Sequence, residues 1–373
     1  MSEKNNAIFT AAVIAAVILI FTVADIFHGD KIYSETENRV LATKPEASRE
    51  TVISGEFASD YETYVTDQFV SRDKWIAIKT QMDIVLQKKE INGVYLAADN
   101  YLIEQHLPED YPDILVAKKT ELLQRLVDKW DAVVMLVPTA DNILTDKMPA
   151  NAPCYDQTVF LENISAQVGD DHYVDVYSIL KAHADEDIYY RNDHHWTSLG
   201  AYYGYLAWAG TMGETPYGYR INAMTTVSED FLGTLHSKTN LDRPGDTIQY
   251  FRATQKRPVT VTYDFDRVTD TLYEESYLDS KNQYGFFMDD NHAFIQIDTR
   301  YRNGKMLFVI KDSYANSMVP LLIPHYERIY VVDLRYYNGR LSSLMEQVEP
   351  DNGMDVLVLY NCIHFLEDFS YIE

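Results

Sequence analysis

Asp193 and His195 are a pair of residues whose types and spacing suit general-base chemistry. They lie two positions apart in the segment 189–202, where Thr197 is a good N-cap for the helix that should follow. In an extended turn such residues share a face, so the carboxylate can accept the Nδ1 proton of the imidazole and leave Nε2 as a base. The pair therefore predicts a base, although Asp-x-His in turns more often only satisfies the backbone.

Ser313 is the matching candidate for a nucleophile. It follows the apolar run 305–310, which reads as a buried strand that ends at a turn into a helix. Ligands of open α/β sheets bind at the carboxyl ends of the strands, and free backbone N–H groups there can hold a developing oxyanion. A serine alone is a poor nucleophile, and His195 is the obvious base for it. A plain helix cap is the commoner role of such a serine.

A metal-binding interpretation of Asp193, His194 and His195 is disfavoured. Adjacent residues seldom converge on one ion, and no second pair of histidines or carboxylates stands at ligand spacing. His172, His183 and His364 are interpreted as ordinary residues. The sequence therefore predicts no metal and no other cofactor.

The elements that must position these side chains alternate between helix and strand. Short runs rich in Val, Ile and Leu, separated by helical stretches, predict strands buried on both faces of a parallel sheet. The predicted strands are 132–137, 172–177, 305–310, 328–334 and 355–360. Residues 210–300 are more polar and β-like, which predicts a β-rich insertion or cap on the α/β core.

Composition and charge exclude several classes of protein. The chain has 373 residues and a formal net charge of −25, whereas binding to nucleic acid needs clustered Lys and Arg. Only Cys154 and Cys362 are present, which excludes a disulfide framework and leaves one optional bridge. An abundance of 29 tyrosines suits sugar-like ligands, but use in cores and interfaces is the likelier reason.

The N-terminus predicts the compartment. Residues 7–24 form an uncharged apolar run long enough, as a helix, to cross most of a bilayer core of about 30 Å. The alternative is a cleaved signal peptide, whose apolar region is usually shorter. Either way the rest of the chain is exported, as a single-pass membrane protein or, after cleavage, as a secreted one. We expect an anchor at 1–27, a tether and docking segment at 28–60, and the main domain at 61–373.

Four places in the chain resemble one known family. Asp193-His194-His195-Trp196, with Thr197 and Gly200-Ala201, is similar to the signature of the DHHW-type proteins. These are similar to the alginate O-acetylation proteins of the SGNH-hydrolase-like superfamily. The other three resemblances lie at Glu37-Asn38-Arg39, at Asp67 to Arg72, and at Lys311 to Asn316 together with Tyr330 to Tyr337.

The resemblance implies an SGNH-like three-layer α/β/α core and a role for each site residue. It implies Ser313 as nucleophile, His195 as base and Asp193 as the acid that orients the base. Lys311 replaces the glycine of the superfamily's Gly-Asp-Ser block, so this block does not assign the oxyanion donors. Candidates for oxyanion or substrate binding are Asn316 together with the Ser313 N–H, Arg335 and Tyr314, although an arginine can equally pair with a carboxylate.

The implied activity is O-acetylation of an exported polysaccharide at the cell surface through an acetyl-serine. Because no acetyl-CoA pool exists outside the cell, the resemblance also implies a membrane-bound O-acyltransferase partner that supplies acetyl groups. Two alternatives stay open. One is a carbohydrate acetyl esterase with the same residues, and the other is a non-catalytic glycan-binding surface protein.

Overall fold

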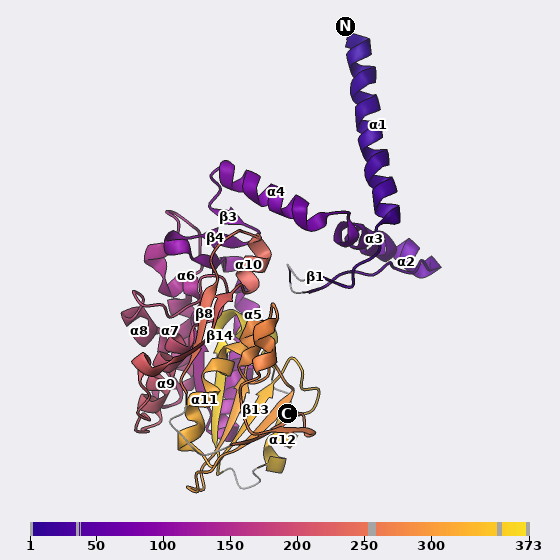
Figure 1. Ribbon diagram of the computed structural model, residues 1–373. Helices are drawn as coiled ribbons and strands as arrows, with labels where there is room; N and C mark the ends of the chain where they lie inside the picture. Colours follow the sequence, from indigo (N-terminus) through magenta and orange to yellow (C-terminus); the bar gives the residue numbers. More distant parts are fainter. Residues whose placement is uncertain (1–2, 35–36, 38, 253–258, 349–352, 371–373) are drawn as a thin grey trace. The chain divides into compact units, whose positions relative to one another are not determined.

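The computed structural model describes residues 3–34, 37, 39–252, 259–348 and 353–370 (Figure 1). Contacts within the chain divide it into two compact units. The first comprises residues 1–88 and 239–242, and the second comprises 89–238 and 243–373. The sequence-based boundary at residue 60 stays a prediction.

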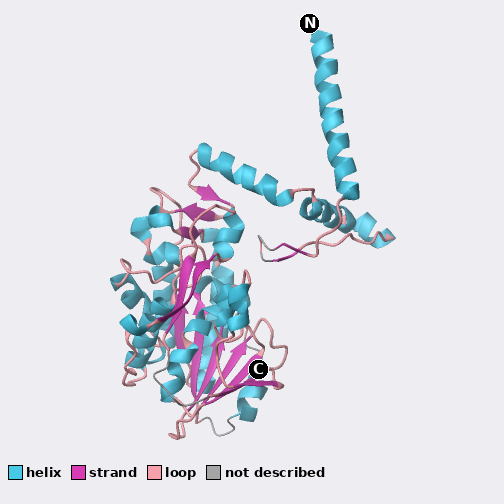
Figure 2. Cartoon of the chain, viewed as in Figure 1, coloured by secondary structure: helices cyan, strands magenta, loops and turns pink. Residues whose placement is uncertain are grey.

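A seven-stranded sheet is the centre of the second unit (Figure 2). Its order is β10-β9-β11-β13-β12-β14-β6, and β13, β12, β14 and β6 run parallel. The strands are β6 (Val133–Val137), β9 (Thr260–Tyr263), β10 (Arg267–Thr269), β11 (Phe294–Asp298), β12 (Met306–Lys311), β13 (Arg328–Asp333) and β14 (Asp355–Asn361). Four of the five predicted strands are therefore present.

Side chains alternate between the two faces of this sheet and build two apolar cores. In β12, Leu307 and Val309 enter one core while Phe308 and Ile310 enter the other, as the period of two along a strand requires. Helices of the first core are α6 (Ala140–Ile143), α8 (Val176–Ala182), α9 (Ser198–Thr211) and α11 (Val319–Leu322); those of the second are α5 (Asp113–Trp130), α7 (Gln157–Val168), α12 (Leu341–Val348) and α13 (Cys362–Asp368). The unit is a three-layer α/β/α structure, as predicted.

Smaller elements complete the second unit. They are β3 (Glu90–Ile91), β4 (Val94–Leu96), β5 (Leu102–Glu104), β7 (Thr225–Phe231), β8 (Asp246–Tyr250) and α10 (Thr234–Thr239). Strands β3 to β5 form one antiparallel sheet, and β7 pairs with β8 in another.

Two details differ from the sequence-based predictions. Residues 172–177 were expected to form a strand, but only Tyr173 makes a bridge, to Val134. Asp175 accepts the Ser178 N–H and caps α8, which turns the chain into a helix at Val176. The β-like region 210–300 is also more than a cap, because β9, β10 and β11 extend the main sheet through antiparallel pairing of β11 with β13.

The first unit contains a long apolar helix and three shorter ones. Its elements are α1 (Glu3–Phe27), β1 (Tyr33–Ser34), β2 (Arg39–Val40), α2 (Arg49–Ser54), α3 (Glu56–Gln68) and α4 (Arg72–Val85). Within α1, residues 5–25 have a mean hydropathy of 2.7 and none of them is buried, so this helix is long and apolar enough to span a membrane or act as a signal anchor.

One carboxylate holds the segment after α1 against α3. Asp67 accepts hydrogen bonds from both Nη atoms of Arg39 and from the Ala42 N–H. The Arg39 guanidinium holds the pKa of this carboxyl at about 2, although burial opposes the shift. The resembling segments at Arg39 and Asp67 therefore contact each other, while Asn38 lies outside the described residues.

Candidate active site

A tight loop before α9 presents Asp193 and His195. Tyr189 pairs with Trp196 across the base of this loop, and the Tyr190 N–H donates to the His195 carbonyl at 3.2 Å. Thr197 caps α9 by accepting the Gly200 N–H, as predicted. Hydrogen bonds between the two sides of the loop, and the cap of the helix that follows it, therefore restrict the positions of the residues between Tyr190 and His195.

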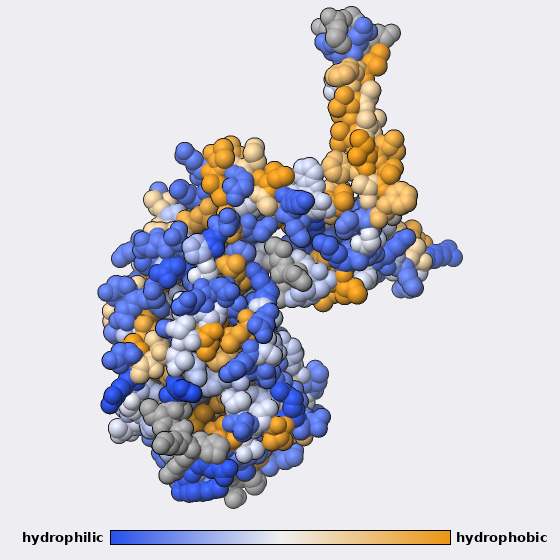
Figure 3. Space-filling model, viewed as in Figure 1, coloured by the Kyte–Doolittle hydropathy of each residue, from blue (hydrophilic) through white to orange (hydrophobic). Residues whose placement is uncertain are grey.

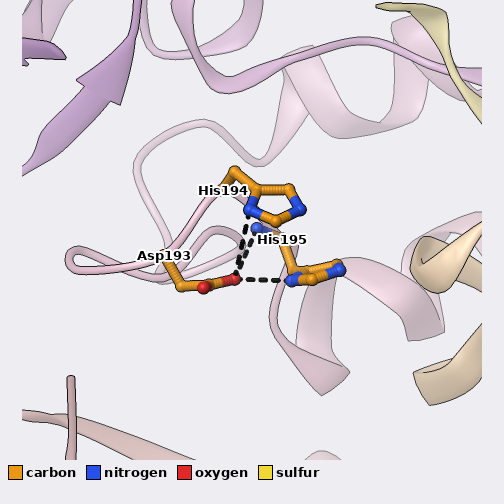
Figure 4. Close-up of side chains that lie close together, drawn as sticks. All are labelled: Asp193, His194 and His195. Atoms are coloured by element: carbon orange, nitrogen blue, oxygen red, sulfur yellow. Dashed lines mark hydrogen bonds and ion pairs between the residues drawn. The ribbon is translucent and has the colours of Figure 1, made fainter. Parts of the chain in front are cut away.

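Asp193 and His195 are directly hydrogen-bonded (Figure 4). His195 Nδ1 lies 2.5 Å from Asp193 Oδ1, and the His195 N–H donates to the same oxygen at 3.0 Å. Burial would raise the pKa of Asp193, but the adjacent imidazoles and these hydrogen bonds outweigh it and lower the pKa well below its usual range. An ionised carboxylate at Nδ1 keeps the proton on that nitrogen and leaves Nε2 free to accept one.

The second oxygen of Asp193 is also occupied. Oδ2 accepts the Thr234 N–H at 2.8 Å and the Thr234 hydroxyl at 3.0 Å. The carboxylate packs against Gly233, where a Cβ would lie only 2.2 Å from Oδ2. Residue 233 must therefore lack a side chain for Asp193 to keep this orientation.

Ser313 stands opposite His195. Its Oγ lies 2.8 Å from His195 Nε2, although the two residues are 118 positions apart in the chain. Ser313 follows β12 and opens the 3-10 helix η8 (Ser313–Ser317), and its exposed fraction is only 7%. Its own N–H has no acceptor among the described residues, so it is free to donate to a developing oxyanion.

Asp312 fixes the turn that carries the serine. Oδ1 accepts the Tyr314 N–H at 2.9 Å, while Oδ2 accepts the Asn361 N–H at 2.9 Å and faces His364 Nδ1 at 2.8 Å. Burial lowers the pKa of His364, but the hydrogen bond and charge of Asp312 outweigh it and raise the pKa overall. His364 was interpreted as an ordinary residue from the sequence; here it supports the residue next to Ser313.

Replacing His364 by glutamine should lower the free energy of unfolding more at acidic than at alkaline pH. Because the folded-state pKa of His364 is raised, its contribution is complete below the unfolded value of about 6.5 and is lost as pH rises through the folded pKa. We expect a loss of about 1.5–3 kcal/mol near pH 5.5, shrinking towards pH 9, in denaturant titrations of the full chain. His172→Gln is the control, since its partner Asp131 is almost fully exposed. An equal loss at both pH values would contradict the assignment.

Lys311 and Arg335 bind the same carboxylate. Lys311 Nζ lies 3.2 Å from Asp333 Oδ2. Arg335 donates two hydrogen bonds to the same carboxylate, from Nε to Oδ1 at 2.9 Å and from Nη2 to Oδ2 at 2.6 Å. Burial lowers the pKa of Lys311, and Asp333 opposes this shift. Both cations also donate to Asn291 Oδ1, at 2.8 and 3.2 Å. Arg335 is thus paired with a carboxylate, and its role in substrate binding stays a prediction.

Tyr314 and Asn316 are fully buried beside the serine. The Tyr314 hydroxyl donates to the His194 carbonyl, and its own carbonyl accepts the Trp196 indole N–H at 2.8 Å. Tyr314 therefore joins the histidine loop to the serine turn and has no exposed surface for a ligand in this conformation. Asn316 Nδ2 donates to the Asp290 carbonyl at 3.2 Å, so its role at the oxyanion stays a prediction.

Tyr284 is a contact of the site that no motif indicated. Its ring stacks on His195, with centroids 3.9 Å apart and planes at 12°, and its hydroxyl donates to the Ser313 carbonyl at 3.2 Å. It comes from the insertion, in the 3-10 helix η7 (Gln283–Phe286). Only the tertiary structure shows that this region forms a wall of the site.

His194 lies beside His195 but has different neighbours. Burial and the adjacent imidazole of His195 lower the pKa of His194 to about 3, so the His194 ring stays neutral. Among the described residues, ligand atoms of Asp193, His194 and His195 form the single group close enough to hold a metal ion, within 4.8 Å of one another. However, both Asp193 oxygens have protein donors and His195 Nε2 faces Ser313, so these atoms already serve other contacts.

Comparisons with known proteins give the same fold. A DHHW family protein from Eubacterium siraeum aligns with a TM-score of 0.60 and 23% identity, over 76% of this chain and 97% of the other. PatB1 from Bacillus cereus, solved with a sulfonyl adduct, aligns with a TM-score of 0.58 and 20% identity, over 75% of this chain and all of the other. No curated protein sequence matches significantly.

These likenesses confirm the three-layer α/β/α fold expected from the resemblance. The family model described as DHHW protein matches residues 87–332, roughly two thirds of the chain. This match includes the loop with Asp193 and His195 as well as Ser313. The chain therefore belongs to the DHHW protein family.

Proposed function

We propose that this protein is a cell-surface O-acetyltransferase that transfers an acetyl group to a hydroxyl of an exported polysaccharide. The observation that carries the proposal is the hydrogen-bonded series from Ser313 Oγ to His195 Nε2, 2.8 Å, and from His195 Nδ1 to Asp193, 2.5 Å. A serine, a base and a carboxylate in this order are the machinery of acyl transfer through a covalent ester.

In the first half-reaction, Ser313 Oγ attacks the acyl carbonyl of the donor while its proton passes to His195 Nε2. The tetrahedral oxyanion accepts a hydrogen bond from the free Ser313 N–H, and Asn316 is a second candidate donor. Collapse breaks the bond to the donor's leaving group, which takes the proton from His195. The acetyl group is then an ester on Ser313.

In the second half-reaction, a sugar hydroxyl attacks this ester and His195 accepts its proton. Collapse expels Ser313 Oγ, which recovers the proton, and leaves the acetylated sugar. Ser313 and His195 are only 7% and 5% exposed. Such burial limits access of bulk water to the ester, which is a condition for transfer to a sugar hydroxyl.

The apolar helix α1 supports retention in the cell membrane with the catalytic unit outside the cell. The acceptor polysaccharide and a membrane-bound O-acyltransferase that supplies acetyl groups are the partners we propose, on the basis of the resemblance of the motifs. A tethered enzyme would stay near a donor that is produced in the membrane.

The full chain, purified in detergent, should release nitrophenol from 4-nitrophenyl acetate. In the presence of acetyl-free oligosaccharides, a transferase forms acetylated sugar, detected by mass spectrometry, and an esterase forms only acetate. Release of nitrophenol with no acetylated sugar from any acceptor would favour the esterase. A protein that binds glycans but is inert in both assays would be the non-catalytic alternative.

A further inference from the structure

Helix α4 has an exposed apolar stripe along one face. The exposed fractions are 45% for Trp75, 53% for Ile78, 56% for Met82, 74% for Val85 and 66% for Leu86, the residue after the helix. At 100° per residue these positions fall within about 100° of one another. Figure 3 shows apolar side chains gathered along α4 as well as along α1. The stripe is broad enough to require a partner in water.

The opposite face of α4 is already packed within the first unit. Thr80 is buried, and its hydroxyl donates to the Thr239 carbonyl at 2.8 Å. Asp83 is also buried and lies 3.4 Å from the Lys79 ammonium and 2.7 Å from that of Lys88. The apolar stripe is therefore a second surface and not the core face of the helix.

The stripe begins next to the apolar helix α1. The ring of Phe21, inside the candidate span 5–25, lies 5.6 Å from the ring of Trp75 and 5.7 Å from that of Phe69. Tryptophan is enriched where a protein crosses the boundary between lipid and water. The first residue of the stripe thus lies beside the end of the span.

The charge of α4 also suits a lipid surface. Helix α4, residues 72–85, contains three Lys or Arg and two Asp, a net charge of +1 in a chain whose net charge is −25, and Lys88 and Lys89 follow the helix. Some of this charge is used inside the unit, because Arg72 pairs with Glu37 and Asp83 pairs with two lysines. The basic residues that remain favour contact with anionic head groups.

We propose that α4 lies on the outer surface of the bilayer, with its apolar stripe buried at the boundary between head groups and acyl chains. An apolar stripe, basic residues and a tryptophan beside a membrane span are the features of interfacial helices, whose apolar face enters the boundary by about 5–10 Å. The inference rests on retention of α1 as the proposed anchor. If α4 lies on the bilayer, the first unit contacts the membrane through both α1 and α4. The chain passes from this unit to the second unit after Lys88.

The test uses the full chain in vesicles of phosphatidylcholine and phosphatidylglycerol, with no other protein present. Single cysteines at Ile78, Met82 and Val85 carry an environment-sensitive fluorophore, in a chain with Cys154→Ser; Cys362 is fully buried and will not react. Ile84→Cys is the matched control, because Ile84 is 39% exposed but lies about 160° around the helix from Met82 and about 100° from Val85.

We expect blue-shifted emission and quenching by brominated lipids at the three stripe positions and much weaker effects at residue 84. Emission typical of water at all four positions, in a chain that resists extraction by alkaline carbonate, would overturn the inference, because the stripe would then face water beside the bilayer. Extraction of the chain by carbonate would instead refute the proposed anchor, and the inference would fall with it.

Discussion

Ser313→Ala should abolish acyl transfer, with kcat for 4-nitrophenyl acetate at least about 10³-fold below wild type. Alanine removes the oxygen that lies 2.8 Å from His195 Nε2, and Ser317 in the same turn cannot replace it because its hydroxyl contacts Tyr284 and the Tyr314 carbonyl. Nitrophenol release by equal concentrations of folded protein measures the effect.

Ser317→Ala is the matched control, since it removes a buried hydroxyl one helical turn away and should keep activity within about tenfold. A sulfonyl fluoride gives a second measurement, because such a reagent reacts with a serine that a neighbouring base activates. Attack by Ser313 Oγ on sulfur expels fluoride and adds the sulfonyl group to one peptide. Undiminished activity or labelling in Ser313→Ala would remove this residue from the mechanism.

Asp193→Asn should lower kcat by about 10⁴-fold, as expected when a base loses its correct tautomer. An asparagine cannot satisfy its neighbours in either orientation. If its oxygen faces His195, its amide meets the Thr234 N–H, which is also a donor. If its amide faces His195, it meets the His195 N–H and favours the tautomer whose Nε2 carries a proton. That tautomer cannot accept the Ser313 proton.

Asp187→Asn is the control for this variant, because Asp187 belongs to the same region but is 66% exposed and pairs with Arg191 on the surface. We expect a change of no more than about threefold. Circular dichroism should show both variants folded. Activity of Asp193→Asn close to that of wild type would exclude Asp193 from the proposed triad, and a matching loss in Asp187→Asn would point to a disturbed loop.

The sequence predicted those features of the structure that depend on residues close together in the chain. The N-cap at Thr197, the four parallel strands and the apolar run of α1 follow from side chains close together in the chain, and the structure contains each of them. The strand expected at 172–177 failed because the cap at Asp175 acts against the β-propensity of its neighbours. Local signals therefore agree with the fold except where two of them compete.

Contacts between segments far apart in the chain could not be predicted from the sequence, because they depend on how the strands pair. The register of β12 and β14 pairs Lys311 with Leu359, and this brings the Asn361 N–H to Asp312. The same pairing brings His364, 52 positions away, to the carboxylate beside Ser313. The charge of Lys311 would place it at the surface, yet it is fully buried. Burial is possible because Asp333 and Asn291 accept hydrogen bonds from its ammonium group.

What the sequence determined by itself is the set of reactive residue types and the elements on which they stand. It placed an acid and a base two residues apart in a turn, a serine after a buried strand, and an apolar helix at the N-terminus. Only the tertiary structure decided that Ser313 meets His195, that Tyr284 covers the imidazole and that Gly233 makes room for Asp193. The physical reason is that hydrogen bonds and ring contacts act over a few ångströms, and segments far apart in the chain come that close only after the sheet has paired and its helices have packed.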